Sequence, residues 1–146
     1  MADGVKTVLF LCVANSARSQ MAEGLARALA PAGYQFLSAG SHPGILNPLA
    51  VIALREIGID ISHHRAKGLD GIALEQVDTI VTLCAEEVCP VVPAPVRRVR
   101  WPLPDPAAVD GAPEEQLAAF RATRDRLREN LPELWASPRA GARGQS

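Results

Sequence analysis

The feature that most constrains the fold is an apolar run that ends in a cysteine and leads through a polar loop into a helical pattern. Residues 8–11 are all apolar, and Cys12 follows them directly. A run of this kind predicts a buried strand. Asn15 and Ser16 are residue types that commonly begin a helix, so we expect one to start there. Apolar side chains then recur with the helical period at Met21, Ala22, Leu25, Ala28 and Leu29.

Strand and helix patterns alternate over the rest of the chain. Residues 35–39 predict a second strand, which Gly40 closes. Asn47 followed by Pro48 is a preferred helix start, and Gly58 is expected to end that helix. Residues 79–83 predict a strand that is buried on both faces. Residues 96–101 predict a weaker strand at a sheet edge, because arginines alternate there with apolar residues.

The last helix is predicted from about Glu114, and Pro132 should kink or end it. Prolines recur so often between Cys89 and Pro113 that we expect little regular structure there besides the strand at 96–101. The inner side of the last helix is marked by Leu117, Phe120, Arg124, Leu127, Leu131 and Leu134.

This alternation of strands and helices predicts an α/β fold. Right-handed crossovers between parallel strands give a three-layer α/β/α domain with a four-stranded parallel sheet. Active sites in such sheets lie beyond the carboxyl ends of the strands. Cys12, Cys84 and Asp105 each follow a predicted strand, so we expect them to gather at one edge.

The composition fits one small globular domain. The 146 residues are 48% hydrophobic, enough for a single core, and we expect one domain at 1–136 with a disordered tail at 137–146. A net charge of -1 argues against a nucleic-acid partner, whose phosphates require a basic face. The N-terminal apolar run is too short for a signal sequence or membrane span, so we expect a cytoplasmic protein. Three cysteines form no disulfide framework, and a reducing compartment favours reactive roles for them.

Cys12, Arg18 and Ser19 together predict a site for a tetrahedral oxyanion beside a thiolate. A strand end followed by a polar loop and a helix N-terminus aims backbone N–H groups at one point. Arg18 adds a planar fork of donors, and Ser19 can donate to the sulfur. The same positive environment favours the thiolate, which is the nucleophilic form. The alternative is a small buried cysteine and a solvated surface arginine.

This chain resembles the arsenate reductases that are built on the low-molecular-weight protein tyrosine phosphatase fold. The resemblance begins with Cys-Val-Ala-Asn-Ser-Ala-Arg-Ser-Gln-Met-Ala-Glu-Gly at residues 12–24 and covers nearly the whole chain as far as the last helix. It continues at residues 38–40, Asn47-Pro48, residues 59–62, residues 81–84 and Asp105-Pro106. Two departures are Ala14, where the family usually has glycine, and Ala17, where many members carry a second loop cysteine.

The resemblance implies conversion of arsenate to arsenite, with a role for each matching residue. Cys12 would be the nucleophile, and Ser19 would stabilise its thiolate. Asp105 would protonate the leaving oxygen, although an aspartate beside a proline is equally often a turn residue. No metal or cofactor is implied. The anion would be bound by the loop residues Val13, Ala14, Asn15, Ser16 and Ala17 together with Arg18.

Cys84 and Cys89 distinguish between two kinds of enzyme. A phosphatase hydrolyses its phosphocysteine with water, whereas a reductase needs a second and a third thiol to pass on a disulfide. We therefore expect a Cys12/Cys84/Cys89 cascade, although thioredoxin-coupled members commonly place more residues between the last two cysteines. The alternatives are a low-molecular-weight protein tyrosine phosphatase and a non-catalytic oxyanion-binding protein, in which Cys84 would be a core thiol and Cys89 an incidental surface thiol.

The resemblance also implies partners and an ion site. Thioredoxin or a small thiol would complete the cycle, and we expect a monomer with a weak phosphatase side activity. Some related reductases bind potassium through residues that match Asn15, Glu23 and Ser38, with an acidic residue where this chain has Lys67. A lysine ammonium there would supply the charge of the ion; the alternative is a solvated surface lysine.

Overall fold

The computed structural model describes residues 5–85 and 96–135, and a four-stranded parallel sheet lies at its centre. The strands β1 (Lys6–Cys12), β2 (Tyr34–Gly40), β3 (Thr79–Thr82) and β4 (Arg97–Arg100) are ordered β2-β1-β3-β4. In this register Cys12 pairs with Gly40, and Leu11 pairs with Thr82. The predicted α/β class and four-stranded parallel sheet are confirmed, and β4 lies at the edge as expected.

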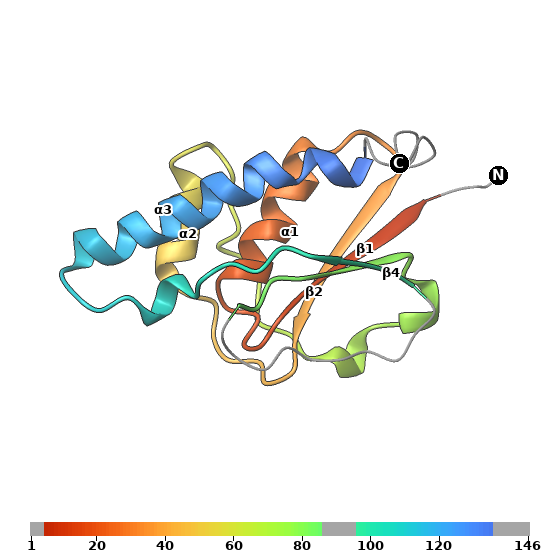
Figure 1. Cartoon of the computed structure of the whole chain (residues 1–146), viewed down its shortest axis with the longest axis horizontal. Helices are drawn as coiled ribbons and strands as arrows, with labels where there is room; N and C mark the ends of the chain where they lie inside the picture. The colour runs from red at the N-terminus through yellow and green to blue at the C-terminus, as the bar shows by residue number, and fades with distance from the viewer. Residues whose placement is uncertain (1–4, 86–95, 136–146) are drawn as a thin grey trace.

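Three α-helices of the described residues pack together on one face of this sheet (Figure 1). They are α1 (Arg18–Leu29), α2 (Pro48–Arg55) and α3 (Pro113–Asn130). The predicted inner side of α3 is confirmed, and this helix ends two residues before Pro132. None of the helices in the described ranges is long and apolar enough to cross a membrane. The helices share one core with the sheet residues Val8, Phe10, Phe36 and Val81.

The opposite face of the sheet is covered by the later part of the chain between α2 and β3. This part, residues 69–76, lies on the side away from the three α-helices in Figure 1. It contains two 3-10 helices, η1 (Leu69–Gly71) and η2 (Leu74–Gln76), which the sequence patterns did not indicate. Their apolar side chains Leu69 and Leu74 pack against a second cluster built on Leu9, Leu11 and Ile80. Both faces of the central strands are therefore buried.

The two helix starts predicted from capping residues have different outcomes. The amide N–H of Leu49 donates to Asn47 Oδ1 at 2.9 Å, and Pro48 occupies the first turn of α2, as expected. The prediction that Asn15 and Ser16 begin the first helix is wrong. The helix begins at Arg18 after Ala17, which offers no side-chain cap. Asn15 instead takes a left-handed conformation with φ 52°, which asparagine tolerates better than most residues.

The loop at residues 13–17, here named the Cys12 loop, is held from outside by backbone hydrogen bonds. The N–H groups of His42, Gly44 and Asn47 donate to the carbonyl oxygens of residues 13, 14 and 16 at 2.8, 2.9 and 2.9 Å. A trans peptide directs its C=O and N–H groups to opposite sides. Because these carbonyls point toward residues 42–47, the N–H groups of the same peptides point into the loop.

Gly40 lies at the close contact between the end of β2 and the Cys12 loop. A Cβ atom at this position would clash with the carbonyl oxygen of Val13 and would lie 2.8 Å from the amide nitrogen of Asn15. The N–H of Gly40 donates to the carbonyl of Lys67 at 2.9 Å. The backbone on both sides leaves room only for glycine.

A cluster of charged side chains joins α2 to α3. Glu56 contacts Arg121 at 2.6 Å and Arg124 at 2.9 Å, and Arg124 also donates to the carbonyl of Ala53 at 2.8 Å. These contacts, led by the hydrogen bond from Arg121, lower the pKa of Glu56 from its ordinary 4.5 to about 2. The carboxylate therefore stays charged into acidic solution.

We predict that Gly40→Ala destabilises the fold and weakens anion binding, because the new Cβ must displace the Cys12 loop. The expected loss of unfolding free energy is about 1–3 kcal/mol, as for other overpacked sites. Denaturant unfolding and calorimetric titration with phosphate measure the two effects. Gly71→Ala is the matched control, since a Cβ there meets no atom within 4 Å. Wild-type stability and phosphate affinity in Gly40→Ala would contradict the account of this contact.

We predict that Glu56→Gln lowers stability at neutral pH and makes stability less sensitive to acid. A group whose pKa is lowered by folding stabilises the protein above its unfolded pKa, and this contribution disappears as pH falls toward the folded value. The difference in urea midpoint between wild type and variant should therefore shrink between pH 4.5 and about 2. Glu129→Gln, an exposed position on α3, serves as control. A difference that stays constant with pH would show that the charge is not the cause.

Candidate active site

The thiol of Cys12 lies at the carboxyl end of β1, where two donors reach its sulfur. Cys12 is buried at 2% exposure. Its Sγ lies 2.9 Å from Ser19 Oγ and accepts from the amide N–H of Asn15 at 3.2 Å. The predicted contact between Ser19 and the sulfur is present. The nucleophilic form of a cysteine is the thiolate, and both contacts are made to the atom that would attack.

Ser19 is itself oriented by the side chain of Asn15. The amide Nδ2 of Asn15 donates to Ser19 Oγ at 2.7 Å. A hydroxyl that accepts this bond has its own proton left to donate to the sulfur of Cys12. The other side of the Asn15 amide is fixed as well, because Oδ1 accepts from the backbone N–H of Lys67 at 2.8 Å and from Gln20 Nε2 at 2.9 Å.

Arg18 is buried at the first position of α1, and backbone carbonyls orient its guanidinium. Its NH1 donates to the carbonyl of Leu103 at 2.9 Å and to that of Leu83 at 3.4 Å. Its NH2 lies 4.0 Å from Asp105 Oδ2. These contacts come from the segments that follow β3 and β4, so the arginine joins three strand ends at one edge of the sheet.

A cavity of about 170 Å³ opens between the Cys12 loop, Arg18 and Asp105. Asn15, which we expected to bind the anion with the rest of the loop, is not among its lining residues and is fully buried. The other predicted binding residues of the loop do line the cavity. The lining consists of Cys12, Val13, Ala14, Ser16, Ala17, Arg18 and Asp105.

Asp105 follows β4 and caps a short 3-10 helix, η3 (Pro106–Ala108). Its Oδ1 accepts from the amide N–H of Ala107 at 3.0 Å, while Oδ2 faces Arg18. The turn position that the sequence predicted is present, and the same carboxylate also lies near Cys12 and Arg18. One oxygen holds the loop, and the other faces the cavity beside Cys12, here named the anion cavity after the ligand that the sequence predicts. The Asp105 side chain is 37% exposed.

Cys84 follows β3, next to the strand that carries Cys12. The N–H of Leu83 donates to the carbonyl of Leu11 at 3.0 Å, so the two strand ends stay in register. Cys84 is buried at 2% exposure. The expected grouping of Cys12, Cys84 and Asp105 at one sheet edge is present, whereas Cys89 lies outside the described residues.

Two supporting residues were missed from the sequence. Gln20 Nε2 also donates to the carbonyl of Arg65 at 2.8 Å, and Gln20 Oε1 lies 3.1 Å from His64 Nδ1. The pKa of His64 is lowered, mainly because the ring is partly buried, whereas the negative charge of Glu23 acts to raise it. Neither residue carries a local signal, because the contact joins α1 to a segment more than forty residues away.

Lys67 lies close to the residues that the resemblance linked with potassium. Its Nζ is 3.3 Å from Ser38 Oγ, 3.2 Å from the carbonyl of Arg65 and 3.7 Å from Glu23 Oε1. Glu23 also pairs with Arg27 at 2.7 Å. Within residues 5–85 and 96–135, no group of three or more His, Cys, Asp or Glu side chains is placed to hold a metal ion.

Comparison with known proteins places this arrangement in a family. Residues 7–141 match the model of the low molecular weight phosphotyrosine protein phosphatases. An arsenate reductase of Halalkalibacterium halodurans is 42% identical over 128 residues, which are 86% of this chain and 92% of that protein.

Solved structures agree with this relationship. The structure described as an arsenate reductase in the phosphate binding state has a TM-score of 0.75 and 31% identity, and the match covers 91% of this chain and 98% of that one. The thioredoxin-dependent arsenate reductase of Corynebacterium glutamicum has a TM-score of 0.73 and 28% identity, over 97% of this chain and 65% of that one. This chain therefore belongs to the low molecular weight phosphotyrosine protein phosphatase family, in which these relatives are arsenate reductases.

Proposed function

We propose that this protein reduces arsenate to arsenite with Cys12 as the nucleophile. The observation that carries the proposal is the sulfur of Cys12 in a small cavity lined by the Cys12 loop and Arg18, with donors from Ser19 and Asn15. A tetrahedral oxyanion in this cavity would meet the inward N–H groups of the loop. The guanidinium of Arg18 would provide bidentate donors on one side.

The first step forms a sulfur–arsenic bond. The Cys12 thiolate attacks arsenic, one arsenic–oxygen bond breaks, and the oxygen leaves as water after it has taken up two protons, one of which Asp105 supplies. Support for this role comes from the position of Asp105 Oδ2, which faces the cavity near Arg18. Arsenic keeps its +5 oxidation state at this stage.

The second step transfers two electrons to arsenic. The thiolate of Cys84 attacks the Cys12 sulfur, so that a disulfide forms, the sulfur–arsenic bond breaks, and arsenite leaves with the electron pair. Cys89 then attacks Cys84, which releases the Cys12 thiolate and leaves a Cys84–Cys89 disulfide. A dithiol reductant of the thioredoxin class, or a small thiol, would restore the starting state in a reducing cytoplasm.

The test is an assay of NADPH consumption with thioredoxin and thioredoxin reductase, with and without arsenate. We expect consumption that depends on arsenate and arsenite as the product. The same reaction supplied with a small thiol in place of thioredoxin identifies the reductant. A protein that hydrolyses aryl phosphates but leaves arsenate unreduced with either reductant would be a phosphatase, contrary to the proposal.

We predict opposite behaviour for two cysteine variants. Cys12→Ser should abolish both arsenate reduction and the side activity on aryl phosphates, because a serine hydroxyl without an adjacent base is a poor nucleophile. Cys84→Ser should lose repeated arsenate turnover but keep the phosphate ester hydrolysis, which uses Cys12 and needs no second thiol. Unfolding midpoints near that of wild type establish that both variants are folded. Arsenate turnover by a folded Cys12→Ser protein would assign the nucleophile to another residue.

We predict that activity depends little on potassium, because the ammonium of Lys67 lies beside Ser38 and Glu23 and supplies a positive charge there. The measurement is kcat/KM for arsenate in potassium and in sodium at constant ionic strength. Lys67→Asp removes the ammonium and adds a carboxylate beside Glu23, so this variant should become dependent on potassium. A several-fold rise for the wild type in potassium would contradict the prediction.

A further inference from the structure

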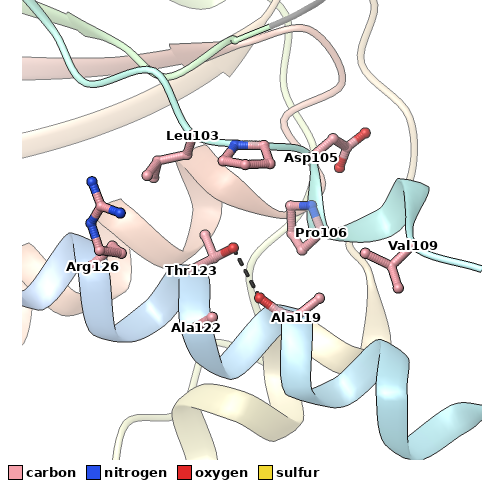
Figure 2. A pocket seen from close by; sticks show the side chains of 9 residues that line it. Leu103, Asp105, Pro106, Val109, Ala119, Ala122, Thr123 and Arg126 are labelled. Atoms are coloured by element: carbon pink, nitrogen blue, oxygen red, sulfur yellow. Dashed lines mark hydrogen bonds between the residues drawn. The ribbon is translucent and has the colours of Figure 1, made fainter.

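A second cavity lies behind Asp105, between the loop that carries this residue and helix α3. Its volume is about 240 Å³. The loop wall is formed by Leu103, Pro104, Asp105, Pro106 and Val109, and the helix wall by Ala119, Ala122, Thr123 and Arg126. Figure 2 shows the Asp105 carboxylate pointing away from this space. Asp105 thus lines two cavities, the anion cavity on one side and this one on the other.

The walls of this cavity are mostly apolar. Small side chains on α3, Ala119 and Ala122, leave the recess open. The hydroxyl of Thr123 donates to the carbonyl of Ala119 at 3.0 Å within the helix, as Figure 2 shows. The polar atom of Thr123 is therefore already occupied. The space is open to solvent on one side, since Pro104, Ala122 and Arg126 are exposed. Its volume exceeds the roughly 150 Å³ of an enclosed cavity that holds a benzene ring, so an apolar group of that size fits.

Arg126 is the charged group at one end of the cavity. Figure 2 shows its side chain rising from α3 beside Leu103. Other arginines of α3 have carboxylate partners: Arg121 and Arg124 contact Glu56, and Arg128 contacts Asp125. Within the described ranges Arg126 makes no ion pair or hydrogen bond. A guanidinium that is not matched by a carboxylate of the protein is suited to an anionic group of a ligand.

We propose that this cavity binds a small carboxylate that carries one apolar ring or short chain. The apolar body occupies the space between the loop 103–109 and α3, and the carboxylate pairs with Arg126. This site is separate from the anion cavity, where Cys12 and Arg18 lie, although the two share Asp105 as a wall. The binding does not depend on the redox chemistry of the cysteines.

Benzoate is the probe, and a titration of the full-length protein followed by amide NMR is the measurement. We expect saturable shifts at residues 103–109 and 119–126. Benzamide should bind about two- to fivefold more weakly, because it lacks the negative charge that pairs with the exposed Arg126, and acetate at least about tenfold more weakly, because it lacks the apolar ring. Saturating phosphate should leave the benzoate affinity unchanged. Shifts confined to the Cys12 loop, or competition between benzoate and phosphate, would contradict the proposal that the two sites are separate.

Three variants complete the test. Arg126 is exposed, so Arg126→Gln should weaken benzoate about two- to fivefold. Ala122→Leu should weaken both benzoate and benzamide by filling the recess. Arg128→Gln is the matched control, because Arg128 pairs with Asp125 and does not line the cavity. Equal affinity for benzoate in wild type and Arg126→Gln would overturn the role of Arg126. No saturable binding of benzoate by the wild type would overturn the proposal as a whole.

Discussion

The hydrogen bonds between residues 42–47 and the carbonyl groups of the Cys12 loop are the constraint on which the site depends. They turn three carbonyl oxygens away from the cavity, so that the N–H groups of the same planar peptides face inward. Gly40 permits the backbone contact that brings the two segments together. Without these hydrogen bonds, the Cys12 loop would present both N–H groups and carbonyl oxygens to the cavity. An oxyanion would then lose much of its proposed binding site.

The parallel sheet brings the remaining groups to the same edge. The Cys12 loop follows the central strand β1, and the ends of the neighbouring strands β2 and β3 lie on either side of it. Residues after β3 and β4 supply the carbonyl oxygens that orient Arg18, and the chain after β4 supplies Asp105. The groups proposed to bind the anion, to donate a proton and to receive the disulfide therefore come from adjacent strand ends.

Patterns that repeat along the chain predicted most of the fold, whereas contacts between distant segments were missed. The buried strand before Cys12, the Asn47 cap and the edge position of β4 each follow from local residue types. The start of the first helix was wrong, because Asn15 uses its side chain for Ser19 and Lys67 instead of a cap. The 3-10 helices η1 and η2 are too short to give a periodic pattern.

In the candidate site, too, local motifs could be predicted and contacts between distant segments could not. Cys12, Arg18 and Ser19 lie in one short motif, so their grouping could be predicted. The link from Gln20 to His64 could not, since it depends on the path of the chain after α2. Cys89 lies outside the described residues. Its proposed role, to attack Cys84 and take over the disulfide, therefore rests on the chemistry of the reaction and not on a position in the structure.

The cysteine cascade can be followed in a single turnover of the protein. Fully reduced protein is mixed with one equivalent of arsenate and no other reductant, the free thiols are alkylated, and mass spectrometry identifies the linkages. We expect one equivalent of arsenite, a Cys84–Cys89 disulfide and an alkylated Cys12. Unreduced arsenate with all three cysteines alkylated would contradict the proposed reaction, and a stable Cys12–Cys84 disulfide would contradict the role of Cys89.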